Sequence, residues 1–252
     1  MGLAIDASPW STLAENACDK LELQAYINSP SLLVITKANK ISPVHRPAYL
    51  DYIAIKNYNS KGEMIGEHRF FGLFTRSAYN SRALDIPLLE TRIRQAQSRA
   101  YFQKGSHNAK MLLQILETFP RDEQFQSTVD ELYDTAMGVL SIDERNRVRA
   151  FCRNDPFHRF YSLLIYLPRE RYSQQVREKV QALVAQRCDA EETEFDIQFS
   201  QSTLARLQLI VRPKSGQTLP LDMRELEQDI ETLTQNWEDS LQSELKVLQS
   251  KK

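Results

Sequence analysis

The chain has 252 residues, of which 42% are apolar and 26% charged, and its formal net charge is −1. At about 150 residues per domain, this length provides for one or two domains with a sizeable core. The near-zero net charge argues against wholesale binding to polyanions, so no nucleic-acid partner is expected.

Glycine is scarce in this sequence. Only seven glycines are present where an average usage of about 7% gives about 18, and no two of them are spaced as G-x-G. A dinucleotide fingerprint and a P-loop each need clustered glycines to bring backbone N–H groups close to phosphate. We therefore expect no NAD site, no other cofactor and no catalytic residue within this chain.

Three further classes of protein are disfavoured. The longest apolar runs, Leu163 to Leu167 and Leu32 to Ile35, are far shorter than the roughly 20 residues that span a bilayer, so no membrane partner is expected. Three scattered cysteines are typical of reduced thiols in a cytoplasmic protein and not of a disulfide framework. The four histidines never fall at metal-ligand spacing, so no metal site is predicted.

The first third of the chain is predicted to form a small sheet after a lead-in. Residues 1–30 are weakly patterned, with helical character expected from Ser11 to Tyr26. Residues 31–84 form a first, partial module that is rich in β-structure. Its three apolar or β-rich runs read as strands, the last two of which flank a hairpin turn at 59–62: Ser31–Ala38, Tyr49–Asn57 and Glu63–Phe74.

From residue 85 to 141 the apolar period changes from two to about 3.6, which predicts a helical connector. Three helices are expected around Leu88–Ile93, Met111–Leu116 and Val129–Leu140. Ser127–Asp130 supplies an N-terminal signal for the third helix, because a hydroxyl can cap a free N–H group there.

Residues 142–220 are predicted to form a second module with the order ββαββ. Asn146–Asn154 and His158–Leu167 flank a turn containing a proline, and Ser173 caps the following helix. Two strands with clean alternation follow, at 194–199 and 205–212. Such alternation is typical of an antiparallel sheet with one covered face. The predicted fold class is therefore α+β, with two antiparallel-sheet modules joined by helices.

Residues 221–252 are predicted to form one long amphipathic helix. At 1.5 Å per residue, its stretch from Leu221 to Leu248 would be about 42 Å long, more than one small sheet requires. Its far end should then pack on another copy of the chain or on a further domain; the alternative is a helix of which only the first half docks on its own sheet. The candidate interface residues are Leu226, Ile230, Leu233, Trp237 and Leu241.

The connection before the helix of the second module is a candidate binding site. Arg169 and Arg171 precede the capping residue Ser173, and free N–H groups at a helix start beside arginines can hold a carboxylate or another small anion. The alternative is a solvated strand-to-helix loop.

Seven runs in order along the chain resemble the large bacterial NAD-specific glutamate dehydrogenases. They are Val44–Ile53 (VHRPAYLDYI), Gly66–Arg76 (GEHRFFGLFTR), Phe119–Phe125 (FPRDEQF), Ile142–Arg147 (IDERNR), Arg153–Phe160 (RNDPFHRF), Tyr166–Arg169 (YLPR) and Asn236–Leu241 (NWEDSL). None is a mechanistic motif, but the ordered set is specific and covers roughly 31–249.

The resemblance implies that this chain is a fragment of a much longer enzyme. It would hold the second and third ACT-like modules of the N-terminal regulatory region, and the helices between them. The full-length enzyme would oxidise glutamate to 2-oxoglutarate and ammonium with NAD, in a catalytic domain further along the polypeptide. Partners would be the rest of that polypeptide, further copies in a homo-oligomer, and an amino-acid effector.

Two functions fit this resemblance, and a third is disfavoured. The chain is expected to be a non-catalytic regulatory or oligomerisation segment that senses a small ligand. The alternative is a purely structural scaffold between domains or subunits. An autonomous enzyme is disfavoured by the missing nucleotide motifs.

Overall fold

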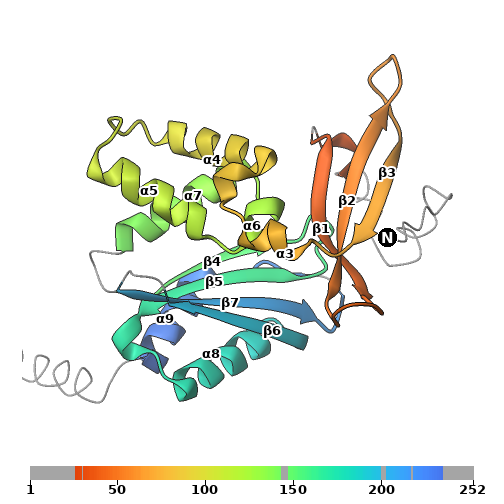
Figure 1. The fold of residues 1–252 in the computed structure, drawn as a ribbon. Helices are drawn as coiled ribbons and strands as arrows, with labels where there is room; N and C mark the ends of the chain where they lie inside the picture. The colour runs from red at the N-terminus through yellow and green to blue at the C-terminus, as the bar shows by residue number, and fades with distance from the viewer. Residues whose placement is uncertain (1–25, 30, 143–146, 200–202, 217, 235–252) are drawn as a thin grey trace, which may run out of the picture. The chain divides into compact units, whose positions relative to one another are not determined.

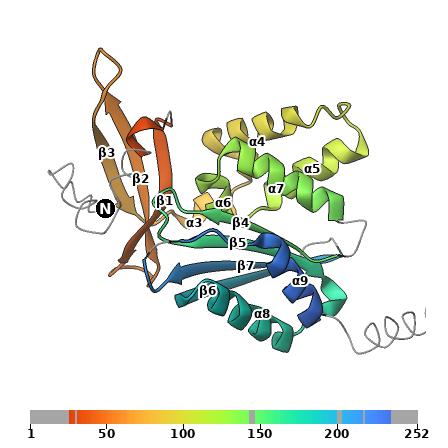
Figure 2. The same ribbon diagram turned by 180° about the vertical axis from the view of Figure 1, so that it is seen from behind.

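The computed structural model describes residues 26–29, 31–142, 147–199, 203–216 and 218–234 (Figures 1 and 2). The chain divides into two compact units, residues 1–136 and 137–252. The expected helix Ser11–Tyr26 lies outside the described residues except for its last position. Each unit has its own antiparallel sheet, as the α+β prediction required.

The sheet of the first unit is a three-stranded meander. Strands β1 (Leu33–Ile41), β2 (Tyr49–Tyr58) and β3 (Met64–Gly72) pair in that order, all antiparallel. The turn between β2 and β3 is held by Asn59, whose side-chain oxygen accepts the backbone N–H groups of Lys61 and Glu63 at 2.9 Å each. Gly62 has a φ of +79°, a conformation that favours glycine. The predicted hairpin is confirmed.

Five α-helices and a 3₁₀ turn follow this sheet. They are α3 (Arg76–Asn80), η1 (Ala83–Asp85), α4 (Pro87–Arg99), α5 (His107–Thr118), α6 (Arg121–Gln126) and α7 (Val129–Ile142), the last of which crosses the boundary between the units. The predicted apolar faces are buried: Leu89, Ile93, Leu112, Leu116 and Leu132 are all 0–1% exposed.

One detail of this helical region differs from the sequence prediction, and another confirms it. Helix α6 lies between the second and third expected helices, where no helix was predicted; its Phe125 stacks on Phe74 with the ring centroids 4.5 Å apart. Thr128 takes the capping role expected at Ser127–Asp130: its hydroxyl accepts the Glu131 N–H at 3.2 Å, and the Glu131 carboxylate accepts the Thr128 N–H at 2.7 Å. This reciprocal pair is a capping box.

A partly buried charged cluster joins the first sheet to α6. The ammonium of Lys37 on β1 lies 2.6 Å from the Asp51 carboxylate on β2 and 3.2 Å from that of Asp122 on α6. Asp122 also accepts the Tyr79 hydroxyl at 2.8 Å, and Asp51 accepts the Phe74 N–H at 2.6 Å. Burial acts to lower the pKa of Lys37, but the two carboxylates outweigh it and raise that pKa. Burial, with Asp122, raises the pKa of Tyr79 to about 12.

A second buried lysine holds the segment that precedes β1. Lys56 on β2 is 2% exposed, and its ammonium donates to the carbonyl oxygens of Tyr26 and Ser29, at 2.5 and 2.8 Å. Burial lowers the pKa of Lys56. A buried ammonium is costly unless it has hydrogen-bond acceptors, and these two carbonyls supply them. The same hydrogen bonds hold the segment that contains Tyr26 and Ser29 against β2.

The second unit is a four-stranded antiparallel sheet with two helices on one face (Figures 1 and 2). Its elements are β4 (Arg149–Asn154), β5 (Tyr161–Pro168), η2 (Arg169–Arg171), α8 (Gln174–Arg187), β6 (Ala190–Phe199), β7 (Leu204–Pro213) and α9 (Met223–Thr234). The spatial order of the strands is β4-β5-β7-β6. The chain therefore runs from β5 through α8 to β6, and β7 lies between these two strands in the sheet. This arrangement is a split βαβ unit.

The core of this unit lies between the sheet and the helices α8 and α9. The alternation predicted for the last strand is confirmed: Ala205, Leu207, Leu209 and Val211 of β7 are 0–2% exposed and face the helices. On β6 the predicted covered face is only partly covered, because Phe195 and Phe199 are 42% and 44% exposed. Val180 and Val184 of α8 and Leu226 and Ile230 of α9 complete the cluster. The predicted long terminal helix is described only as α9, to Thr234. Its first half docks on its own sheet.

The candidate interface residues of that helix fall into two groups. Leu226 and Ile230 are 3% and 0% exposed in the core of their own unit, and Leu233 is half-buried. Trp237 and Leu241 lie outside the described residues. The contribution of these residues to an interface stays a prediction.

Gly138 is required where α7 approaches β4. A Cβ atom built there would lie 2.5 Å from ring atom Cε1 of Phe151. In an open helix, Gly138→Ala would stabilise by about 1 kcal/mol, but overpacking costs about 1–3 kcal/mol. We expect a net loss of about 1 kcal/mol in the free energy of unfolding, measured by chemical denaturation. In a Phe151→Ala background the same change should become stabilising; a stabilising Gly138→Ala in the native background would contradict this packing.

Candidate functional site

The connection from β5 to α8 brings the three residues of the predicted anion site together. Pro168 ends β5, and the 3₁₀ turn η2 carries Arg169 and Arg171 to the start of α8. The backbone N–H of Arg169 donates to the Thr203 carbonyl oxygen at 2.8 Å, which fixes the turn against the segment that enters β7. The three residues thus lie at one end of the helix-covered face of the sheet.

Each of the three side chains has a contact inside this unit. The Ser173 hydroxyl accepts the Val176 N–H at 3.2 Å, so the predicted cap is confirmed. Arg171 donates to Glu231 of α9 at 2.6 Å. The Arg169 guanidinium lies 5.2 Å from the ring centroid of Phe199. Binding of an anion by these residues stays a prediction.

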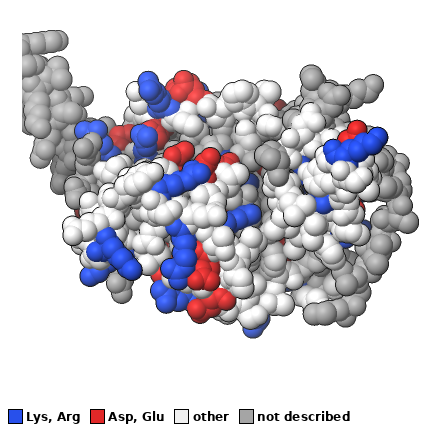
Figure 3. Space-filling view, turned by 90° about the horizontal axis from the view of Figure 1, so that it is seen from above, with Lys and Arg blue, Asp and Glu red and all other residues white. Residues whose placement is uncertain are grey.

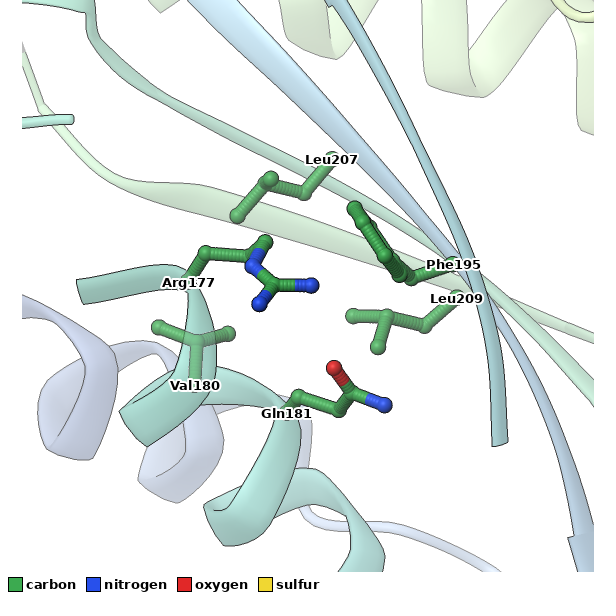
Figure 4. A pocket seen from close by; sticks show the side chains of 6 residues that line it. All are labelled: Arg177, Val180, Gln181, Phe195, Leu207 and Leu209. Atoms are coloured by element: carbon green, nitrogen blue, oxygen red, sulfur yellow. The ribbon is translucent and has the colours of Figure 1, made fainter. Parts of the chain in front are cut away.

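A shallow pocket lies beside this connection, between α8 and the β6–β7 hairpin (Figure 4). Its space is about 180 Å³, including what is open to solvent, and its lining is mixed: Arg177, Val180, Gln181, Phe195, Leu207 and Leu209. Figure 4 shows the Arg177 side chain extending from α8 toward Phe195, and its guanidinium lies 4.3 Å from that ring centroid. Almost none of this space, about 0 Å³, can hold even the centre of a water-sized molecule, whereas pockets for drug-sized ligands have about 300–1,000 Å³. It is therefore a surface depression and not a preformed ligand cavity.

The pocket and the connection share one arrangement: an arginine lies on the face of each exposed phenylalanine of β6. Phe195 and Phe199 are 42% and 44% exposed, and they carry Arg177 and Arg169 respectively. Tyr172 adds an edge-to-face contact with Phe199 at 5.2 Å. A guanidinium over an aromatic face gains roughly 0.5–1 kcal/mol at an exposed site while leaving N–H donors for a carboxylate.

The described residues hold little that could carry out covalent chemistry. Burial raises the pKa of the Cys188 thiol to about 11, so it is a poor nucleophile. No group of three or more His, Cys, Asp or Glu among the described residues could hold a metal ion.

Among the described residues, no helix combines the length and apolar character needed to cross a membrane. On the face in Figure 3, basic and acidic side chains lie next to one another.

Four residues of this region were missed as a set by the sequence prediction: Arg177, Phe195, Phe199 and Glu231. The i, i+4 spacing of the phenylalanines in an alternating strand signals a shared face. Each phenylalanine contacts an arginine, and Arg171 contacts Glu231. The two members of these pairs lie 18 to 60 positions apart in the sequence. No local pattern reveals such pairs.

The fold of the second unit defines a small α+β sandwich, and a match to a known family assigns it to the ACT-like class. Residues 149–238 match the family described as "Glutamate dehydrogenase, ACT2 domain", and residues 86–145 match "Glutamate dehydrogenase, helical motif 1". The second module of this chain thus corresponds to the second ACT-like module of the family. The expectation that it is the third is wrong.

Three bacterial proteins named NAD-specific glutamate dehydrogenase match most of this chain. "NAD-specific glutamate dehydrogenase" of Pseudomonas aeruginosa is 42% identical over 219 residues, which are 87% of this chain and 14% of that protein. The protein of Halomonas elongata is 40% identical over 216 residues, 86% of this chain and 13% of its own length. That of Mycobacterium tuberculosis is 33% identical over 186 residues, 73% and 11%. The chain belongs to the family of NAD-specific glutamate dehydrogenases and spans about one seventh or less of these relatives.

Proposed function

We propose that this chain is a non-catalytic regulatory segment of an NAD-specific glutamate dehydrogenase. The longer protein would oxidise L-glutamate to 2-oxoglutarate and ammonium in the cytoplasm, with NAD bound outside residues 1–252. The match of residues 149–238 to an ACT2 domain carries the proposal. The scarcity of glycine supports it, because the nucleotide-binding loops need clustered glycines.

The second unit is the part of the chain that would bind an effector. Its arginines at the β5–α8 connection and in the neighbouring pocket suit the α-carboxylate of an amino acid, and Phe195 suits an apolar side chain. Regulation then requires that the effector bind more tightly to one of two arrangements of the longer protein.

A thermal-unfolding panel tests whether there is an effector. The 252-residue chain is heated with each amino acid, with 2-oxoglutarate and with NAD. A ligand at 100 times its Kd stabilises the native state by about 2.7 kcal/mol, which is several degrees for units of this size. A selective shift with an amino acid supports a sensor. A shift with NAD alone would contradict the proposal.

Substitution of the arginines tests the place of binding. We expect Arg169→Ala and Arg177→Ala each to weaken the effector response of the full enzyme at least tenfold, because each removes a carboxylate donor, worth about 1.5–3 kcal/mol. Arg224→Ala on the exposed side of α9 is the matched control. An unchanged response in the first two variants would place the site elsewhere.

A structural role is the second candidate, and one observation favours it. Arg171 and Ser173 already serve the fold, through Glu231 and the N-terminus of α8. The chain would then hold domains or copies of a homo-oligomer together without a ligand. That function predicts a concentration-dependent oligomer which Trp237→Ala weakens, as measured by sedimentation velocity. A strictly monomeric chain would count against self-association.

A further inference from the structure

The two edges of the sheet in the second unit differ in chemistry. At the β4 edge, the N–H groups of Val148, which directly precedes the strand, and of Ala150 donate to the carboxylates of Glu231 and Glu227 on α9, both at 3.0 Å. These carboxylates occupy backbone donors that a further strand would need. The β4 edge is therefore closed by a helix of its own unit.

The β6 edge carries a two-sided pattern of exposed side chains. β6 has ten residues and, in the part of the chain described, pairs with β7 alone. On its helix-covered face lie Phe195 and Phe199, 42% and 44% exposed beyond the buried core of β7. On its other face lie Glu192, Glu194 and Asp196, opposite Arg212, Ile210 and Gln208 of β7.

The charges on β6 select what can pair with it. The strand AEETEFDIQF contains four acidic residues and no basic one. Arg212 reaches Glu194 at 2.7 Å, yet Glu194 stays 49% exposed, and Asp196 is exposed as well. Cross-strand neighbours lie about 4.5–5.5 Å apart, so a basic side chain opposite these carboxylates stabilises a pair and an acidic one destabilises it.

The strands of the same unit in a second copy of this chain do not meet these requirements. Antiparallel pairing of β6 with β6 centred on Phe195 would place Glu194 opposite Asp196, and the neighbouring registers also oppose carboxylates. The basic strand β4 of another copy is excluded as well, because Glu227 and Glu231 hold its outer edge.

We infer that β6 is a docking edge for an added protein strand from outside residues 1–252, in which basic and apolar side chains alternate. Backbone hydrogen bonds to β6 would supply the affinity. The apolar side chains of the added strand would cover Phe195 and Phe199, and its lysines or arginines would face Glu192, Glu194 and Asp196. This interaction does not depend on effector binding, although Phe195 belongs both to the pocket and to the edge.

Peptide binding to the 252-residue chain tests this inference. The probes are a labelled peptide of alternating lysine and valine and one of alternating glutamate and valine, with binding followed by fluorescence anisotropy. We expect the basic peptide to bind at least about tenfold more tightly, since three cross-strand charge pairs contribute up to about 1 kcal/mol each. N-methylation of alternate residues along one edge of the basic peptide should abolish binding, because it removes the backbone donors.

Charge variants assign the binding to β6. In Glu194→Lys/Asp196→Lys the preference should reverse, and in the milder Glu194→Gln/Asp196→Gln it should disappear. Asp85→Lys/Asp134→Lys in the first unit changes the net charge equally and should leave the preference intact. Three results would overturn the inference: equal or absent binding of both peptides, an equal effect of the control variant, or a dimer of the chain that Phe195→Asp dissolves.

Discussion

Replacing Lys37 with methionine is expected to lower the free energy of unfolding of the first unit by about 3–5 kcal/mol. The Asp51 side chain is 4% exposed and that of Asp122 is 28% exposed, and the Lys37 ammonium is shared between them. Without the ammonium, two partly buried carboxylates lie close together. No opposite charge then offsets the cost of removing them from water. The stability of β1 and β2, followed by hydrogen exchange, is the measurement.

Two further variants separate this cause from a general effect of losing a cation. Arg94→Met removes an exposed i, i+4 pair with Glu90 and should cost less than about 0.5 kcal/mol. In Lys37→Met/Asp51→Asn/Asp122→Asn the carboxylates are neutral, so most of the loss should be recovered. If the triple variant is as unstable as the single one, the cluster does not act through charge.

Removing both carboxylates that close the β4 edge is expected to cost about 2–4 kcal/mol. Glu227→Ala/Glu231→Ala orphans the N–H groups of Val148 and Ala150, at about 1–3 kcal/mol for each buried donor, and releases Arg171. An opened strand edge is also a template for association with another chain. We therefore expect lower stability in chemical denaturation together with concentration-dependent association in sedimentation velocity.

The same helix provides the matched control. Glu225 and Asp229 of α9 pair with Arg187 at the surface, so Glu225→Ala/Asp229→Ala should cost less than about 1 kcal/mol for each pair and cause no association. Glu227→Gln/Glu231→Gln keeps an oxygen acceptor and should retain much of the stability. Equal losses in the two alanine pairs would show that the β4 edge does not depend on these carboxylates.

The two edges of the ACT-like sheet in the second unit differ in what they leave open to a partner. One edge is closed by α9 and the other, β6, carries exposed phenylalanines and carboxylates. On our inference, a partner strand would be accepted at the β6 edge and not at the β4 edge. If the second unit both binds an amino acid near Arg177 and accepts a strand at β6, the two events lie on neighbouring residues, because Phe195 belongs to the pocket and to the edge.

The amino-acid sequence determined the elements of this chain because their signals are local. Alternation placed Leu207 and Leu209 on the covered face of a strand, a 3.6-residue period placed Leu112 and Leu116 on the buried side of a helix, and Ser173 marked a helix start. The short helix α6 was missed because six residues carry too little periodicity to stand out.

Only the tertiary structure decided which elements meet. The order β4-β5-β7-β6 depends on how α8 packs across the sheet, and no spacing in the sequence encodes it. Lys37 and Asp122 are 85 positions apart, and Glu231 meets Val148 across 83 positions. Periodicity reports which side of an element is buried, whereas the choice of partner for a buried charge or an edge N–H group is made by contacts between distant segments of the folded chain.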